Sequence, residues 1–470
     1  MNNRKNTPLS IKLFCLLLML TLGNQSAFAQ QAKRPNFILI LTDDLGWSCF
    51  SSKMDDKNPD SKSDYYETPN IDKFAKQSMR FTRGYAPDPI CTPSRRSIQF
   101  GQTSIRQGDE EFAAQYAPAQ SINQSIPQVL KAFDSRYKAA HFGKWDLRAK
   151  ITPEQLGYDI SDGDTGNKNG NISDDKDEKW TQHFLTKNPK QIDSITQHSI
   201  HFMQQQVKAN NPFYLQVSHY ATHANFETQQ ASFDKFKAKP VGKKHDNPAW
   251  AGMINDLDKS IGELLKMVDD LGIGDNTYIV LMADNGAVEF IPPVSNRLDH
   301  PSLFAEQMRN YPLRGGKWTL YEGGIRVPFI VKGQGIQKGS QSDVPVAGWD
   351  LLPTFNELAG NSSKMSAHTD GGSLASVLKK GDKGTVKRPS NDFYFHRYNN
   401  GYPHSAIIVG DYKLIKFWKT KKIELYDIGK DLGEINDISK QKASKAAELE
   451  AKLMLYINEV NPSLAKRYVK

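Results

Sequence analysis

The chain has 470 residues, of which 38% are hydrophobic, and a formal net charge of +9 at pH 7. This length exceeds the size of most single hydrophobic cores, so a large domain with a smaller appended one is expected. The positive charge suits an anionic substrate or a solvated basic surface, but no basic stripe with interleaved aromatic residues accompanies it, so nucleic acid is not the expected partner.

The N-terminus has the pattern of a secretory signal peptide over residues 1–29. Three basic residues lie within the first 12 positions, an apolar run extends from Leu13 to Leu22, and Ala27-Phe28-Ala29 forms a small-x-small cleavage site. Because the apolar run is too short to span a bilayer, no stable membrane insertion is expected. The pattern predicts a periplasmic or secreted protein with a mature chain starting near Gln30 and a net charge of +6.

Apolar runs bounded by turn residues alternate with amphipathic stretches, a pattern typical of an α/β fold. Five runs are predicted as buried strands, at residues 37–41, 137–142, 213–217, 278–282 and 327–331. Polar residues follow each of the first four runs directly. Ligands bind outside the carboxyl ends of strands in open α/β sheets, so we expect these polar residues to converge.

The rest of the chain gives a domain plan. Residues 247–271 have apolar positions on one helical face and predict a helix, whereas the polar residues 159–179 predict an exposed surface loop. A polar linker at 381–389 separates a predicted catalytic domain, 33–380, from a C-terminal subdomain, 390–470. Within the subdomain, the pattern predicts strands at 406–409, 412–417 and 425–427 and a helix over 442–457.

The segment Cys91-Thr92-Pro93-Ser94-Arg95 is the most informative in the chain. One interpretation is a small buried cysteine beside a turn that contains proline. Another is a disulfide with Cys49, since these two cysteines alone remain after removal of the predicted signal peptide and an oxidising compartment favours pairing.

A third interpretation is catalytic, because the segment resembles the Cys-x-Pro-x-Arg segment of type I sulfatases, of the alkaline-phosphatase-like superfamily. In that family a formylglycine-generating or an anaerobic sulfatase-maturing enzyme oxidises the cysteine to formylglycine. The aldehyde hydrate attacks sulfur, and its second hydroxyl then allows the carbonyl to re-form and sulfate to leave. The resemblance implies a large, mixed, mostly parallel sheet sandwiched by helices, with a smaller C-terminal subdomain that contains an antiparallel sheet and a helix.

Four hard oxygen donors follow two of the predicted strands, as Asp43-Asp44 and Asp284-Asn285. Either pair alone is more simply a helix cap, but together with the cysteine segment they suggest a Ca²⁺ or Mg²⁺ site rather than a zinc site. In the resembled family such a set binds one Ca²⁺ together with the formylglycine, here at Cys91.

Four further residues match the family by local motif. Arg95 resembles the arginine that holds the aldehyde hydrate, Lys144 in Gly-Lys-Trp resembles a lysine that contacts sulfate, and His223 resembles the histidine near the leaving-group oxygen. Lys317, followed by the Glu-Gly-Gly run at 322–324, resembles the second sulfate lysine. A transferring sulfuryl group carries charge on three oxygens, so a ring of cations suits it.

Asp146 departs from the family pattern, which usually has histidine two residues after the lysine of Gly-Lys-Trp. If the backbone were extended, Lys144 and Asp146 would point to the same side, so Asp146 is also expected near the substrate. Its negative charge would be unfavourable beside a sulfate unless Lys144 or the metal offsets it.

The resemblance implies a sulfuric ester hydrolase, and the bacterial-type signal favours a sulfated polysaccharide or oligosaccharide as substrate, such as a carrageenan-type galactan. One alternative is a phosphomonoester hydrolase or phosphotransferase of the same superfamily. Another is an inactive relative that binds sulfated glycans. Four aromatic residues are candidates for stacking on sugar rings, although packing in the core is the favoured interpretation: Trp318, Tyr398, Tyr402 and Trp418.

Overall fold

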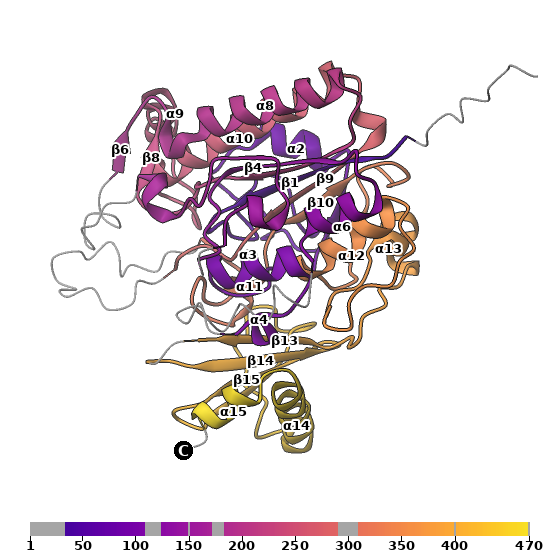
Figure 1. Ribbon diagram of the computed structural model, residues 1–470. Coiled ribbons are helices and arrows are strands. Elements are labelled where there is room, and N and C mark those ends of the chain that lie inside the picture. Colours follow the sequence, from indigo (N-terminus) through magenta and orange to yellow (C-terminus); the bar gives the residue numbers. More distant parts are fainter. Residues whose placement is uncertain are drawn as a thin grey trace, which may run out of the picture. The chain divides into compact units, whose positions relative to one another are not determined.

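An eight-stranded sheet runs through the main body of the protein, with strand order β11-β2-β10-β9-β1-β7-β4-β5 (Figure 1). The computed structural model describes residues 33–108, 124–148, 151–171, 183–289, 309–398 and 401–468, so the predicted signal peptide lies outside the described residues. The strands are β1 (Asn36–Thr42), β2 (Met79–Phe81), β4 (Lys138–Gly143), β5 (Ile160–Ser161), β7 (Phe213–Ser218), β9 (Thr277–Ala283), β10 (Phe329–Lys332) and β11 (Gln341–Ser342).

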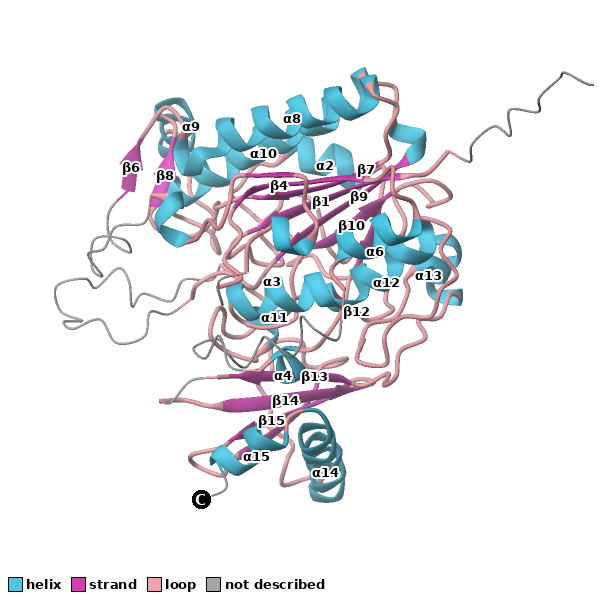
Figure 2. Ribbon diagram, viewed as in Figure 1, coloured by secondary structure: helices cyan, strands magenta, loops and turns pink. Residues whose placement is uncertain are grey.

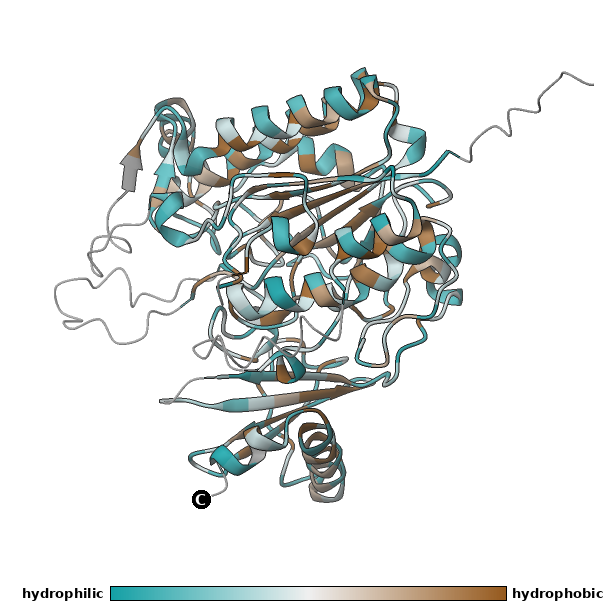
Figure 3. Ribbon diagram, in the orientation of Figure 1, coloured by the Kyte–Doolittle hydropathy of each residue, from teal (hydrophilic) through white to brown (hydrophobic). Residues whose placement is uncertain are grey.

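The sheet is mixed but mostly parallel, as predicted. β1 pairs in parallel with β7 and β9, and β7 pairs in parallel with β4, whereas β10 runs antiparallel to β9. β1, β7 and β9 are buried along their whole length, which explains their continuous apolar sequences. Figure 3 shows that apolar residues gather on these central strands and on the helix faces turned toward them.

Helices cover both faces of this sheet (Figure 2). One face is covered by α2 (Pro69–Ala75), α8 (Ile192–Lys208) and α10 (Pro248–Asp270), with α9 (Gln230–Lys237) packed against α10. On the other face lie α3 (Cys91–Phe100), α6 (Ile126–Phe133), α12 (Leu351–Leu358) and α13 (Ala375–Lys380). Asn247 caps α10 by accepting hydrogen bonds from the N–H groups of Ala249 and Trp250, which confirms the predicted helix.

Short elements complete the main body. Two small parallel sheets pair β3 (Gly84–Tyr85) with β12 (Val346–Ala347) and β6 (His183–Leu185) with β8 (Phe226–Thr228). The remaining short helices are α4 (Ser104–Gln107), α11 (Glu322–Ile325), η2 (Glu154–Leu156), η3 (Asn167–Gly170), η4 (Pro189–Gln191), η5 (Gly274–Asn276), η7 (Gly348–Asp350) and η8 (Gly381–Lys383). Within the described ranges, no helix combines the length and the apolar character needed to cross a bilayer.

The C-terminal part forms an antiparallel meander, as predicted, packed between the main body and two helices. Its strands and helices are β13 (Phe393–Arg397), β14 (His404–Val409), β15 (Tyr412–Phe417), β16 (Ile423–Asp427), α14 (Ala443–Val460) and α15 (Pro462–Tyr468). Alternate residues of β13 face opposite sides: Phe395 packs near Trp349 of the main body, whereas Tyr394 stacks on Tyr456 of α14. The sequence did not predict β13 or α15, and the domain boundary at 381–389 stays a prediction.

Candidate active site

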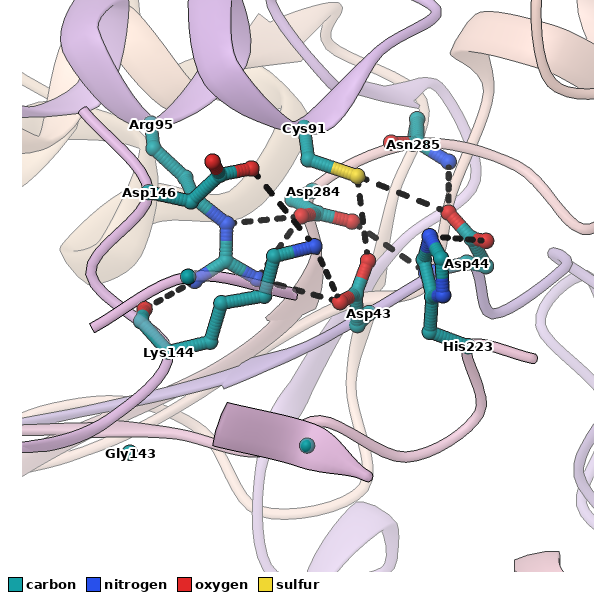
Figure 4. A network of polar contacts seen from close by, with 12 residues as sticks. Asp43, Asp44, Cys91, Arg95, Gly143, Lys144, Asp146, His223, Asp284 and Asn285 are labelled. Atoms are coloured by element: carbon teal, nitrogen blue, oxygen red, sulfur yellow. Dashed lines mark hydrogen bonds and ion pairs between the residues drawn. The ribbon is translucent and has the colours of Figure 1, made fainter. Parts of the chain in front are cut away.

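The polar residues that follow the central strands meet at one edge of the large sheet, as the sequence predicts. Asp43 and Asp44 follow β1, Lys144 follows β4, and Asp284 follows β9. Figure 4 shows Cys91 at the start of α3 above the two β1 carboxylates, with Arg95 and Lys144 on one side and His223 on the other.

Cys91 is the first residue of α3 and is almost fully buried. Its Sγ lies 3.1 Å from Oδ1 of Asp43 and 3.7 Å from Oδ1 of Asp44. Burial raises the pKa of the thiol, and the nearby carboxylates of Asp284 and Asp43 raise it further. Cys49 is also a free thiol, whose Sγ donates to the carbonyl of Arg309 at 3.4 Å, so the alternative of a Cys49–Cys91 disulfide is wrong.

Several donors suited to a cation surround Cys91. Ligand atoms of Asp43, Asp44, Cys91 and His223 all lie within 4.8 Å of one another. Asn285 belongs to the same cluster, since its Nδ2 donates to Oδ1 of Asp44 at 2.7 Å. Its side-chain oxygen, Oδ1, is buried without a hydrogen-bond partner among the described residues. A buried amide oxygen is costly unless it is satisfied, and a bound cation would satisfy it.

Two of the three buried aspartates have a raised pKa, whereas the pKa of Asp43, which burial alone would raise, is held well below its usual value by Lys144 and the other nearby cations. The pKa of Asp284 is raised to about 7, first by burial and then by repulsion from Asp43. Burial also raises the pKa of Asp44, and Asp43 adds to the effect. A hard divalent cation such as Ca²⁺ or Mg²⁺ fits this oxygen-rich set and would relieve the repulsion.

Three buried cations face these carboxylates. Lys144 Nζ lies 2.6 Å from Oδ2 of Asp43, and Lys317 Nζ lies 2.7 Å from both carboxylate oxygens of Asp44 and 3.4 Å from Sγ of Cys91. Burial lowers the pKa of both lysines, but Asp43 and Asp44 outweigh it and leave both raised. Both ammonium groups are therefore charged and lie beside Cys91.

Arg95 is the third cation and connects two parts of the site. Its Nε and Nη2 both lie 2.8 Å from Oδ2 of Asp284, and its Nη1 donates to the carbonyl of Lys144. The three cations balance Asp43, Asp44 and Asp284 in charge. Adding one divalent cation would leave a positive excess, which favours an anionic group such as a sulfate ester.

Close backbone packing brings Lys317 to this position. A Cβ at Gly286, just after Asn285, would meet the carbonyl oxygen of Gly323 at 1.7 Å, so only glycine permits this approach. Lys317 also donates its N–H to the carbonyl of Ala287 at 3.0 Å. The Glu-Gly-Gly run therefore packs directly against the loop that carries Asp284 and Asn285.

His223 is buried and neutral. Its Nδ1 lies 3.0 Å from the carbonyl of Ala224 and donates to it, which leaves a lone pair on Nε2, 3.7 Å from Oδ2 of Asp44. Burial lowers the pKa of His223 well below its usual value, and Lys317 lowers it further. In this state Nε2 can accept a proton, and the ring must accept one before it can donate to a leaving group.

Asp146 lies at the site, but its backbone is not extended. Its φ is +48°, in the left-handed region, and its Oδ2 is still 3.6 Å from Nζ of Lys144. The opposite oxygen, Oδ1, is 3.4 Å from Nε of Arg148. Two cations therefore offset the negative charge that Asp146 brings in place of the usual histidine.

The interpretation of 159–179 as an exposed surface loop is confirmed for most of residues 159–171, although Thr165 and Gly170 are buried, while residues 172–179 lie outside the described residues. Thr165 accepts the N–H of Asp146 with its carbonyl at 2.8 Å and the N–H of Trp145 with its hydroxyl at 3.0 Å. Asp162 accepts the N–H of Gly143 at 2.8 Å. This segment thus fixes the backbone that carries Lys144, and nothing in its polar composition signals that contact.

His219 is one of the polar residues that follow the strand β7, and the sequence assigns it no role of its own. It is fully buried, neither ring nitrogen has a hydrogen-bond partner within the described ranges, and burial lowers its pKa to about 4. Below pH 6.5 the unfolded chain therefore binds a proton that the folded chain does not, and stability falls as the pH drops toward 4.

We expect His219→Leu to remove this contribution. From pH 7.5 to pH 5 the free energy of unfolding of the wild type should fall by about 2 kcal/mol more than that of the variant. Urea unfolding at both pH values measures the difference. An equal fall in both proteins would mean that His219 is protonated in the folded state.

Two family models match the chain. The model described as Sulfatase matches residues 35–361, and the model described as N-sulphoglucosamine sulphohydrolase, C-terminal, matches residues 316–461. Among curated proteins, a sulfatase of Formosa agariphila is 26% identical, with 96% of this chain and 94% of the relative covered. The N-acetylgalactosamine-6-sulfatase of Mus musculus is 28% identical, with 88% of this chain and 78% of the relative covered.

Solved structures share the fold. The structure of Ps i-CgsB in complex with k-i-k-neocarrahexaose has a TM-score of 0.70 at 22% identity, covering 90% of this chain and 93% of that chain. The PsFucS1 sulfatase from Pseudoalteromonas sp. also has a TM-score of 0.70, at 19% identity, covering 97% and 96% of the two chains. At these identities the likeness establishes the architecture alone.

Proposed function

Because the chain belongs to the sulfatase family and is therefore a sulfuric ester hydrolase, we propose that it removes sulfate from a carbohydrate. The observation that carries this proposal is the placement of Cys91 between a cation-binding set of oxygen donors and the ammonium groups of Lys144 and Lys317. A carrageenan-type galactan is a candidate substrate, since one structural neighbour was solved with a neocarrahexaose. The predicted signal peptide supports a periplasmic or secreted location.

Cys91 is the proposed site of formylglycine, formed by a formylglycine-generating or anaerobic sulfatase-maturing enzyme. The hydrated aldehyde would supply a hydroxyl that attacks sulfur and a second hydroxyl that lets sulfate leave. Lys144 and Lys317 would hold the sulfate oxygens, each contributing about 3 kcal/mol of transition-state stabilisation in so dry a site. Arg95 would orient the nucleophile from the same helix through its contacts with Asp284 and with the Lys144 backbone.

His223 would move the proton during cleavage. Its neutral ring presents Nε2 as a base. It would take the proton of the attacking hydroxyl and pass the same proton to the departing sugar oxygen, so His223 would be neutral again after cleavage. Asp146, paired with Lys144 and Arg148, is the nearby carboxylate that would accept a proton when sulfate is released.

Asp43, Asp44, Asp284 and Asn285 would hold one Ca²⁺, which would act as a Lewis acid on a sulfate oxygen. We expect Ca²⁺ to raise the free energy of unfolding by about 2.7 kcal/mol at 100 times its dissociation constant. The shift should shrink strongly in Asn285→Ala, because Oδ1 of Asn285 is a buried ligand oxygen with no hydrogen-bond partner in the part of the chain that the structure describes. Thermal unfolding of the wild type and of the variant, each with Ca²⁺ and with EDTA, measures the two shifts. An equal shift in the two proteins would place the ion elsewhere.

The direct test is an assay of the wild-type protein coexpressed with a maturation enzyme. We expect release of inorganic sulfate from defined sulfated oligosaccharides and an intact mass that shows loss of sulfur at Cys91. Release of phosphate from phosphomonoesters by a protein that retains the Cys91 thiol would favour the phosphatase alternative. Saccharide binding without release of sulfate would favour the inactive glycan-binding alternative.

A further inference from the structure

The structure separates the four aromatic residues that the sequence suggests as sugar contacts. Tyr398 and Trp418 are buried in the core cluster beneath α14, so the core interpretation is confirmed for both. Tyr402 is 49% exposed but lies on the C-terminal sheet, against the rings of His404 and Phe417. Trp318 is partly exposed and directly follows Lys317.

Trp318 has an unusual backbone conformation. Its φ is +74°, in the left-handed region that glycine adopts freely and bulky residues rarely adopt. Such outliers persist where the surrounding structure enforces them, and they cluster at functional sites. A glycine at position 318 would avoid this strain, so the indole must contribute something that offsets it.

Hydrogen bonds fix the Trp318 backbone beside the residues of the candidate active site. Its N–H donates to the carbonyl of Pro89, two residues before Cys91, at 3.0 Å, and the preceding residue bonds to the loop of Asp284 and Asn285 through Ala287. The indole centroid lies 5.5 Å from Nζ of Lys317, and the same Nζ lies 3.4 Å from Sγ of Cys91. A single ammonium group thus bridges the indole and the reactive position.

A sulfated sugar presents two different surfaces to a binding site. The sulfate requires cations, whereas the ring has faces of C–H groups that pack well on the negative face of an aromatic ring. When the sulfate contacts Lys317, the sugar ring that carries the sulfate lies close to the same ammonium group. Trp318 is the aromatic residue that directly follows Lys317 in the chain, and its indole contacts that ammonium.

We propose that the indole of Trp318 is the platform on which the ring of the sulfated sugar stacks, which makes it a specificity-determining residue for saccharide esters. This inference rests on the proposed function, because it requires a carbohydrate substrate. The sulfate is held by Lys144 and Lys317, and the sugar is held by Trp318. The two contributions can therefore be separated by experiment.

Two variants test the platform. Trp318→Gly removes the indole and relieves the left-handed backbone, and this relief should offset most of the lost packing, so its unfolding temperature should stay close to that of the wild type. We expect its KM to rise at least 10-fold for the sulfated oligosaccharide that the wild type cleaves best. Its inhibition constant for inorganic sulfate should stay within 2-fold of the wild type, because the cation ring is intact. Trp318→Phe keeps an aromatic face and should recover most of the lost affinity.

Binding of the desulfated saccharide by calorimetry gives a readout independent of turnover: we expect it to be lost in Trp318→Gly and kept in Trp318→Phe. A wild-type KM in Trp318→Gly would overturn the inference. So would a parallel loss of sulfate inhibition, which would show that Trp318 only supports the Lys317 backbone. If the wild type releases sulfate from no saccharide, the proposed function fails first and takes this inference with it.

Discussion

Replacing Cys91 with alanine is expected to lower kcat/KM for sulfate release by about 10⁴-fold or more and to leave the protein folded. The change removes the proposed nucleophile, while the oxygen donors and the cations that surround it keep their mutual contacts. Cys91 begins α3, and alanine is a good helix former, so the helix should persist. Steady-state kinetics with the thermal unfolding midpoint of the same preparation measures both effects.

Cys49 provides the matched control. It is the other buried free cysteine of the described part of the chain, and its Sγ donates only a weak hydrogen bond to the carbonyl of Arg309. Cys49→Ala should cost about 1 kcal/mol of stability through the lost contacts and leave kcat/KM unchanged. Equal losses of activity in the two variants would contradict a nucleophilic role for position 91.

The central strands are predictable from the sequence because both faces of the sheet are covered. β1, β7 and β9 are buried along their entire length, so each appears as an unbroken apolar run that ends where the chain emerges at the sheet edge. Since parallel strands end at the same edge, the polar residues after them had to meet. The convergence of Asp43, Lys144 and Asp284 follows from that rule alone.

Other parts of the site depend on contacts that leave no periodic signal. β5 has only two residues, Ile160 and Ser161, and its pairing with β4 is local to Ala140 and His141. The segment that follows β5 contacts the active site through Thr165, which accepts the N–H of Trp145, a residue about 20 positions earlier in the chain. Composition describes solvent exposure on average, whereas a single hydrogen bond between distant residues decides whether a polar loop is structural.

A buried charge cluster between the main body and the C-terminal sheet also leaves no signal in the sequence. In the Glu-Gly-Gly run, Oε1 of Glu322 lies 3.0 Å from Nζ of Lys413, and Oε2 of Glu322 lies 2.8 Å from Nε of Arg326. Lys413, on β15, also lies 2.9 Å from Oε1 of Glu434, which accepts the N–H of Glu322 at 2.6 Å through its other oxygen. The cluster thereby connects the C-terminal sheet to the segment that carries Lys317.

Lys413→Met should therefore destabilise the protein by about 3–5 kcal/mol, because it leaves Glu322 and Glu434 buried together with too little positive charge. Burial first, and then repulsion from Glu322, already raise the pKa of Glu434 to about 7 although Lys413 lowers it. Without the lysine that pKa should rise further, so the defect should be larger at pH 8 than at pH 6, where protonation removes the uncompensated charge.

Adding Glu434→Gln to Lys413→Met should restore part of the lost stability and flatten its pH dependence, since one of the two buried charges is then absent. Chemical unfolding of the single and double variants at both pH values measures these effects. If Lys413→Met were as stable as the wild type, or equally destabilised at pH 6 and pH 8, water rather than Lys413 would be compensating the two carboxylates. The position of Lys317 would then depend on the glycine packing around Gly286 and Gly323 and not on the C-terminal sheet.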